Sequence, residues 1–200
     1  MKIVCLDLEG VLVPEIWIAF SEAAGIPELR RTTRDEPDYD KLMNYRLDIL
    51  NKNNIKLHDI QKIISKMDPL EGALEFTNTL REKTQLVILS DTFEQFAKPL
   101  MKKLFWPALF CNSLKVTEDG NVTGYTLRQK NGKKEAVKAL KSMNMNVFAA
   151  GDSYNDIAMI KEAQCGCLFR APQQIRDVCT DLFCVDTFDE LLAVITEFLN

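Results

Sequence analysis

Histidine is almost absent from this 200-residue sequence, which contains a single one, His58. The sequence has six cysteines, but their spacing forms no disulfide framework. Cys165 and Cys167 alternate along an apolar run, and a metal site there would need two further ligands that the pattern does not supply. We therefore expect reduced, buried cysteines and no zinc site at Cys5, Cys111, Cys165, Cys167, Cys179 and Cys184.

Long hydrophobic runs and clusters of basic residues are also missing. No apolar stretch approaches the roughly 18 residues that a membrane span needs, and the opening run Ile3–Leu6 is too short for an export signal. The formal net charge is -4, whereas nucleic acids and anionic membrane surfaces select for clustered Lys and Arg. We expect a cytoplasmic protein with neither a nucleic-acid nor a membrane partner. The oligomeric state is left open.

What is present is an ordinary globular composition, with 46% hydrophobic and 27% charged residues. Short apolar runs alternate with helical patterns, which is typical of a parallel sheet covered by helices. The runs are apolar on both faces, as expected of strands buried on both sides. We predict core strands at Ile3–Leu8, Gln85–Ser90, Ala108–Asn112, Asn146–Ala150, Gly166–Phe169 and Phe183–Val185, and a hairpin at Leu114–Val116 and Val122–Leu127.

One stretch interrupts this alternation. From Pro14 to Met67 there is no strand pattern, and the sequence predicts three helices at Glu15–Ala24, Asp40–Asn51 and Leu57–Met67. The fold class that follows is α/β, a doubly wound, mostly parallel, Rossmann-like sheet with an inserted helical cap. We place the core domain at residues 1–12 and 70–200 and the cap domain at residues 13–69.

Polar residues follow three of the predicted strands. The strand ends read Asp7-Leu8-Glu9-Gly10, Ser90-Asp91-Thr92 and Gly151-Asp152-Ser153. In open parallel sheets the ligand site lies at the carboxyl ends of the strands. We expect these three segments to meet in one crevice.

The first strand end offers a nucleophile and a proton carrier. Asp7 can attack phosphorus and form an acyl-phosphate. Glu9 lies two residues on, so in an extended chain its side chain leaves on the same side as that of Asp7. A second carboxyl there can protonate a leaving alcohol and later deprotonate an acceptor.

The other segments offer phosphate donors and a cation site. The hydroxyl of Ser90 and the backbone N–H groups that follow it, starting at Asp91, can donate to phosphoryl oxygens. Lys133 or Lys134 can supply a point charge for the same oxygens. Asp152 and Asp156, four residues apart at a strand end and in the first turn of a helix, can face one Mg²⁺ ion.

Each element alone has a simpler interpretation. Ser90-Asp91 is a common N-cap sequence, Lys133 and Lys134 suit a solvated surface, and Asp152 with Asn155 could cap a helix from Asp156 to Ala163. All the segments nevertheless fall at the strand ends that one phosphoryl-transfer site requires, and this favours the functional interpretation.

Two other classes of protein remain as alternatives. Receiver domains of two-component signalling also carry a phosphorylated aspartate, but they lack a helical insert after that strand and cluster their metal acids early, whereas Asp152 and Asp156 come late. A catalytically inactive binding module is disfavoured by the complete set of motifs.

At these residues the sequence resembles the haloacid dehalogenase superfamily of phosphotransferases. The four segments that carry the resemblance are Asp7-Leu8-Glu9-Gly10-Val11, Ser90, Lys133 in Lys133-Lys134-Glu135, and Gly151-Asp152-Ser153-Tyr154-Asn155-Asp156. The resemblance implies phosphate binding by Ser90, Asp91 and Lys133, with Lys133 preferred over Lys134. It also implies Mg²⁺ held by Asp7, Glu9 and Asp152 and supported by Asp156.

The helical insert resembles the cap of the phosphoserine phosphatase branch. That resemblance implies that Glu15 binds the ammonium of a small phosphorylated amino acid and that Arg46 binds its carboxylate, with Asn155 also on the substrate and Tyr39 closing over it. The simpler interpretations are a helix first-turn acid for Glu15 and a solvated arginine for Arg46.

Two departures from the common motifs narrow the resemblance. Glu9 stands where the family usually has aspartate, and Ser90-Asp91-Thr92 stands where the phosphatase branch commonly has Ser-Gly-Gly. Both departures are similar to a narrower group, the bifunctional phosphoserine phosphatases and phosphoserine:homoserine phosphotransferases. For that group the resemblance implies phosphoserine as donor, and water or homoserine as acceptor. The other possibility within the family is a phosphatase of a different small phosphorylated metabolite.

Overall fold

The computed structural model describes residues 1–33, 35–36 and 38–200 of the chain. In this part of the chain a seven-stranded sheet has the order β4-β3-β2-β1-β5-β6-β7, and all neighbours are parallel except β3 and β4. The predicted α/β, mostly parallel sheet is confirmed. The strands are β1 Lys2–Leu6, β2 Gln85–Phe93, β3 Ala108–Val116, β4 Val122–Thr126, β5 Asn146–Gly151, β6 Cys165–Phe169 and β7 Cys184–Val185.

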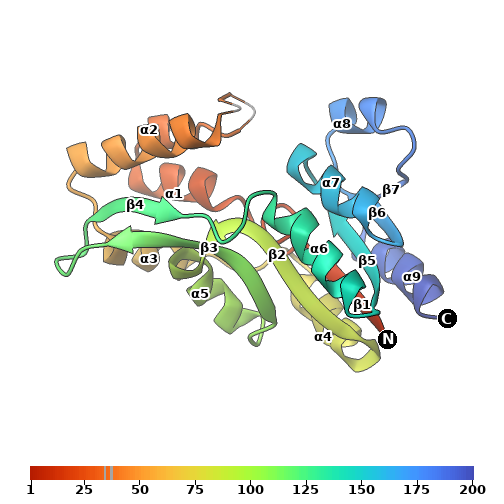
Figure 1. Cartoon of the computed structure of the whole chain (residues 1–200). Coiled ribbons are helices and arrows are strands. Elements are labelled where there is room, and N and C mark those ends of the chain that lie inside the picture. The colour runs from red at the N-terminus through yellow and green to blue at the C-terminus, as the bar shows by residue number, and fades with distance from the viewer. Residues whose placement is uncertain (34, 37) are drawn as a thin grey trace.

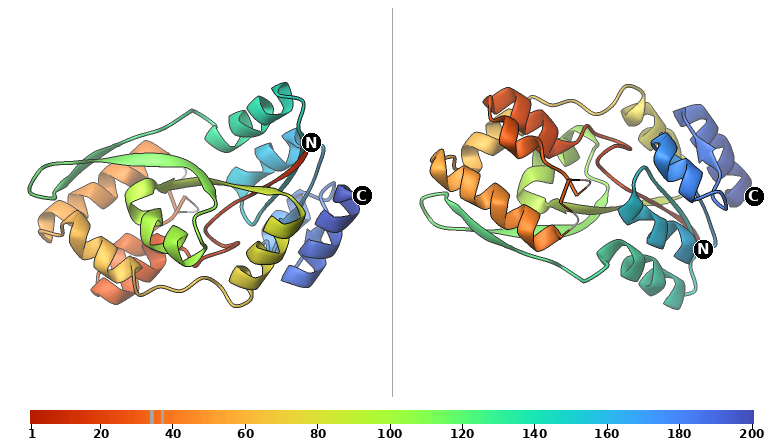
Figure 2. Two further views of the ribbon diagram at one scale, coloured as in Figure 1. Left: turned by 90° about the horizontal axis from the view of Figure 1, so that it is seen from below. Right: turned by 90° about the horizontal axis from the view of Figure 1, so that it is seen from above.

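Alternate residues of the central strands enter different hydrophobic cores, because successive side chains point to opposite faces of a sheet. In β1, Val4 and Leu6 face one core, and Ile3 and Cys5 face the other. Helices cover both faces, as Figures 1 and 2 show. The first face carries α4 Ala73–Lys83, α5 Glu94–Lys103 and α9 Phe188–Leu199, and the second carries α6 Gly132–Ser142, α7 Tyr154–Glu162 and α8 Gln173–Val178.

The strand order places a site at the centre of the sheet. β1 lies between β2 and β5, with β2 and β3 laid down on one side of it and β5, β6 and β7 on the other. The chain therefore leaves β1 at the point where the winding direction reverses, which is where ligands bind in such sheets. The carboxyl ends of β1, β2 and β5 are the three segments that the sequence singles out.

The stretch between β1 and α4 is helical, as predicted. It contains α1 Ile16–Ala24, the short 3-10 helix η1 Pro27–Arg30, α2 Tyr39–Lys52 and α3 Leu57–Ile64. These helices gather near β4 and α5 at one end of the molecule (Figures 1 and 2). Gln61 Nε2 of α3 donates to the backbone carbonyl of Gln95 in α5 at 2.9 Å, and Lys56 forms an isolated bridge with Asn121. We call residues 13–69 the helical insert.

Two of the simpler interpretations, both of them helix caps, are wrong for related reasons. β2 continues to Phe93, and Phe93 itself is the N-cap of α5, so Ser90-Asp91 does not cap that helix. α7 begins at Tyr154, with Ser153 as its N-cap and Asp156 completing the capping box, so neither Asp152 nor Asn155 is the cap. In both places the polar residues extend or follow a strand and remain available for the site.

Across the described ranges, no helix combines the length and apolar character that crossing a membrane would require.

Candidate active site

Asp7 lies directly after β1 and is 4% exposed. Its N–H donates to the carbonyl of Ala150 at 3.0 Å, and its Oδ1 accepts from the N–H of Leu8 at 2.7 Å. The chain then turns at Gly10, where φ is 77° and a Cβ would lie 2.5 Å from the Asp152 carboxyl carbon. Only glycine fits this turn, because both the backbone angle and the space exclude a side chain.

Lys133 is the cation at the centre of the site. It lies in the first turn of α6 and is 4% exposed, and its Nζ is 3.0 Å from Asp7 Oδ2, 2.7 Å from Asp156 Oδ1 and 3.7 Å from Asp91 Oδ2. Burial opposes the charged form, but the neighbouring carboxylates more than compensate, so the pKa of Lys133 is raised. The surface-lysine interpretation is therefore wrong for Lys133, and Lys134 is only half-buried.

Three carboxylates meet beside this lysine. Asp7, Asp152 and Asp156 each place one oxygen so that these atoms lie within 4.8 Å of one another. Burial raises the pKa of Asp7 well above its usual range, with Asp156 adding to the effect and Lys133 opposing it. Burial, then Asp156 and Glu15, raises the pKa of Asp152 to about 7. One ammonium does not balance three close acids, so the residues fit a hard divalent cation.

Asp156 is already fully engaged within the protein. Its Oδ1 accepts from Lys133, and its Oδ2 accepts from the N–H groups of Asp152 and Ser153 at 3.1 and 3.0 Å. A Cβ on Gly151 would lie 2.2 Å from the Asp156 carboxyl carbon, so glycine is required before Asp152. Asp156 thus anchors the loop that carries Asp152, which suits a supporting role beside a cation.

Glu9 is half-buried and lies outside the group of three carboxylates. Its Oε2 accepts from the N–H of Ile16 at 2.9 Å. Burial raises the pKa of Glu9 to about 7, with Glu15 adding to the effect, while hydrogen bonds from Ile16 and Thr92 and the charge of Arg46 lower it. A carboxyl with this pKa can both give and take a proton near neutral pH, as a general acid and base must.

Arg46 points from α2 into the interior and is 6% exposed, so the interpretation as a solvated arginine is wrong. Its Nη2 donates to the carbonyl of Arg31 at 2.7 Å, and the guanidinium lies 4.5 Å from the Trp17 ring centroid. Its Nε has no hydrogen-bond partner among the described residues. Burial lowers its pKa to about 10, so the side chain stays charged and has an unused donor.

Glu15 precedes α1 as its N-cap but makes no side-chain capping bond. It is half-buried, and its negative charge raises the pKa values of Glu9, Arg46 and Asp152. The structure therefore brings the two predicted residues of the insert, Glu15 and Arg46, close to the acids at the sheet edge.

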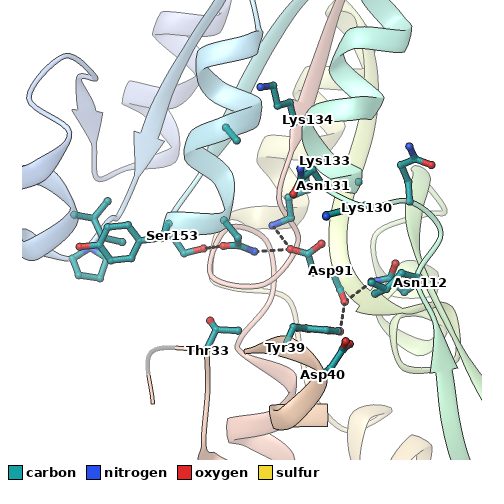
Figure 3. Close-up of a pocket in the computed structure, with 18 of the residues that line it drawn as sticks. Thr33, Tyr39, Asp40, Asp91, Asn112, Lys130, Asn131, Lys133, Lys134 and Ser153 are labelled. Carbon is teal, nitrogen blue, oxygen red and sulfur yellow. Dashed lines mark hydrogen bonds and ion pairs between the residues drawn. The ribbon is translucent and has the colours of Figure 1, made fainter. Parts of the chain in front are cut away.

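Ser90 and Asp91 lie near the end of β2. Ser90 is 6% exposed, and its Oγ accepts from the N–H of Thr92 at 3.2 Å. The Asp91 carboxylate accepts from Asn155 Nδ2 at 2.7 Å, besides its contact with Lys133 (Figure 3). All the predicted site residues thus belong to segments that converge on this edge of the sheet.

Asn112 is a site residue that the sequence analysis missed. Its Nδ2 donates to the Asp91 carbonyl at 2.9 Å, and its Oδ1 accepts from the N–H of Arg128 at 3.0 Å. Tyr39 of the insert, whose match to a cap aromatic the sequence suggested, donates its hydroxyl to the same Asp91 carbonyl at 3.3 Å. The sequence did carry a signal for Asn112, because this polar residue ends the predicted strand Ala108–Asn112.

A cavity of about 1290 Å³ opens beside this network (Figure 3). Tyr39, Asp91, Lys133 and Asn155 are among its lining residues. Asp7 and Glu9, by contrast, are not among its lining residues.

Comparisons with known proteins agree with this geometry. The family model of haloacid dehalogenase-like hydrolases matches residues 1–164. The chain is 53% identical to phosphoserine phosphatase ThrH of Pseudomonas aeruginosa, over 96% of this chain and 93% of that protein. It is 54% identical to a phosphoserine phosphatase of Pseudomonas syringae pv. tomato, over 96% and 81% of the two chains.

Solved structures of the same fold include a phosphoserine phosphatase in its apo form, with a TM-score of 0.75, 22% identity and coverage of 93% of this chain and 94% of that one. A phospho-aspartyl intermediate analogue of phosphoserine phosphatase gives a TM-score of 0.73 at 21% identity, with 96% and 97% coverage. The family model covers most of the sequence. The chain therefore belongs to the haloacid dehalogenase-like hydrolases.

Proposed function

We propose that this protein is a Mg²⁺-dependent phosphoserine phosphatase and phosphotransferase that works through a phosphorylated Asp7. One observation carries the proposal: the Asp7 carboxylate, at the end of the central strand, lies 3.0 Å from the buried Lys133 and beside Asp152 and Asp156. The relatives named phosphoserine phosphatase, at 53% and 54% identity, support the choice of substrate.

The protein groups divide the chemistry between them. Asp7 attacks phosphorus, forming a bond to one carboxylate oxygen while the bond from phosphorus to the serine oxygen breaks. Glu9 gives its proton to that leaving oxygen. In the second half, Glu9 takes a proton from water or from the hydroxyl of homoserine, which attacks the phosphoryl group and frees Asp7.

Two side chains and one backbone N–H hold the phosphoryl oxygens in this proposal. Lys133 supplies charge, and the Ser90 hydroxyl and the N–H of Asp91 supply directed hydrogen bonds. We assign the cation to the carboxylates of Asp7 and Asp152 and to a backbone oxygen of Glu9, which leaves the Glu9 side chain free to carry the proton, with Asp156 anchoring the loop of Asp152. When bound, Mg²⁺ would neutralise the close acids and the charge on the transferring oxygens.

The helical insert, as a cap domain over a core of residues 1–12 and 70–200, holds the amino acid part of the substrate. Arg46 offers a buried cation with a free N–H donor, which suits the substrate carboxylate. Glu15 offers a carboxylate for the ammonium, and Asn155, which donates to the Asp91 carboxylate, is assigned to the substrate near the phosphate donors.

The deciding experiment is a phosphate-release assay with phosphoserine and Mg²⁺, repeated with a chelator and then with homoserine. We expect release that stops in chelator, returns with Mg²⁺ and yields phosphohomoserine when homoserine is present. Turnover of other small phosphorylated metabolites but not of phosphoserine would contradict the substrate assignment. Full activity in chelator would contradict the proposed requirement for Mg²⁺.

Replacing Arg46 by alanine is expected to lower kcat/KM for phosphoserine far more than kcat/KM for a simple aryl phosphate. Loss of a partly buried charged contact costs about 2–5 kcal/mol, and only phosphoserine has a carboxylate to make that contact. The measurement is kcat/KM for both substrates. Arg30→Ala is the matched control, because Arg30 is exposed and pairs with Glu22. Equal losses on both substrates would show that Arg46 acts on the fold or on the phosphate.

Replacing Glu9 by aspartate is expected to shift the products from phosphohomoserine towards free phosphate. Glutamate is one methylene longer than aspartate, and misplacing a proton carrier by about 1 Å can cost 10²-fold. We infer that Glu9 is better placed to take a proton from the hydroxyl of an acceptor alcohol than from a small mobile water. The product ratio at fixed homoserine measures this. An unchanged ratio with the rate retained would mean that a backbone shift near Gly10 absorbs the methylene.

A further inference from the structure

The Asp91 carboxylate occupies donors that a phosphate needs. Its Oδ2 accepts from Asn155 Nδ2 at 2.7 Å and lies 3.7 Å from Lys133 Nζ. Asp91, Lys133 and Asn155 all line the cavity, and Figure 3 shows Asp91 facing Lys133 there. An ammonium and an amide that converge on one anionic oxygen form the kind of site that binds a phosphoryl oxygen.

The main chain of Asp91 is held independently of its side chain. The backbone carbonyl accepts from Asn112 Nδ2 at 2.9 Å and from the Tyr39 hydroxyl at 3.3 Å. The side chain, by contrast, is 44% exposed. A rotation of the Asp91 side chain into the cavity would therefore free Lys133 and Asn155 without moving β2.

Several anionic groups compete for the ammonium of Lys133. It already contacts Asp7 at 3.0 Å and Asp156 at 2.7 Å, both of them buried. A phosphate that reaches Lys133 would bring further negative charge next to Asp91, and at a few ångströms like charges in a partly buried site repel strongly. Either Asp91 moves away or the phosphate binds weakly.

We propose that Asp91 is a specificity-determining residue, an internal anion that competes with phosphate for Lys133 and Asn155. The proposal rests on the proposed function, which places the phosphoryl group at these donors. It means that the phosphate group alone binds poorly. A phosphoamino acid overcomes the competition through its contacts with Arg46 and Glu15, whereas free phosphate has no such contacts and leaves readily.

The test is calorimetric titration of the Mg²⁺-loaded protein with inorganic phosphate, which requires no turnover. Asp91→Asn keeps an oxygen that can accept from Asn155 but removes the charge. We expect it to bind phosphate at least about tenfold more tightly than the wild type. Asp91→Glu keeps the charge and is expected to bind phosphate as weakly as the wild type.

Asp40→Asn is the matched control. Asp40 lines the same cavity, but its carboxylate accepts from the Tyr125 hydroxyl and not from the phosphate donors. This variant loses the same charge, and its phosphate affinity is expected to change by less than about threefold. Equal tightening in Asp40→Asn would overturn the proposal, because the effect would then be one of general charge.

Unchanged or weaker phosphate binding in Asp91→Asn would also overturn the proposal, since Asp91 would then hold its neighbours in place for the phosphate. Tight binding in Asp91→Glu would show that charge is not the cause. Failure of the proposed function looks different: phosphoserine would not be turned over, while Asp91→Asn would still bind phosphate more tightly than the wild type and the other two variants.

Discussion

Replacing Asp7 by asparagine is expected to abolish phosphate release from phosphoserine. The carboxamide cannot form the acyl-phosphate, and removing a nucleophile of this kind leaves only the contribution of the surrounding groups. The expected loss is at least about 10⁴-fold in kcat, measured with saturating Mg²⁺ and phosphoserine.

The same variant is expected to fold normally, because asparagine has nearly the same shape and can still accept from the N–H of Leu8. Thermal unfolding and circular dichroism check this. Near-normal turnover by folded Asp7→Asn would overturn the mechanism as a whole.

Replacing Lys133 by methionine is expected to damage both stability and activity. Lys133 is 4% exposed and contacts Asp7, Asp156 and Asp91, so its removal leaves buried carboxylates without their cation. Breaking a buried ion pair from one side costs about 3–5 kcal/mol in the free energy of unfolding. Denaturant unfolding of the metal-free protein measures that cost, and kcat/KM measures the loss of the phosphate contact.

Lys134→Met is the control for this change. Lys134 is the next residue on the same helix and is half-buried, and the carboxylates of Asp7, Asp91 and Asp156 pair with Lys133 instead. We expect its unfolding free energy to change by less than about 0.5 kcal/mol. Equal effects of the two variants would mean that the contacts of Lys133 with the acids carry little energy.

The strand ends were the predictable part of the site. Asp7, Ser90 and Asp152 follow apolar runs, and parallel strands bring their carboxyl ends to one edge, so the meeting of these residues follows from pattern alone. Gly10 and Gly151 carried a further signal, because each fits a position where a Cβ would collide with a site carboxylate.

Other features depended on three-dimensional packing. Lys133 and Lys134 are adjacent, and the face of α6 that turns inward decides between them. The direction of Arg46 depends on how α2 packs over Trp17. β2 continues to Phe93 although Ser90-Asp91 is a good helix-capping sequence. Pairing of β2 with β3 outweighs the local preference of these two residues for a helix N-terminus.

The contacts of Asp91 could not be read from the sequence at all. They join residues from β2, β3, α2, α6 and α7, which only the folded chain brings together. A charged residue near the end of a strand suggested phosphate binding through its N–H, whereas the position of its carboxylate beside Lys133 suggests competition with phosphate.

The most direct test of the central claim is to trap the phosphoenzyme. The protein is mixed with phosphoserine and Mg²⁺, quenched in acid within the first turnover and digested with trypsin, and the peptides are analysed by mass spectrometry. Cleavage after Lys2 and Arg30 releases residues 3–30 as one peptide. The mechanism predicts one phosphoryl group on this peptide, at Asp7, and none in Asp7→Asn. A phosphoryl group on another residue, or turnover with no trapped phosphoenzyme under rapid quench, would contradict it.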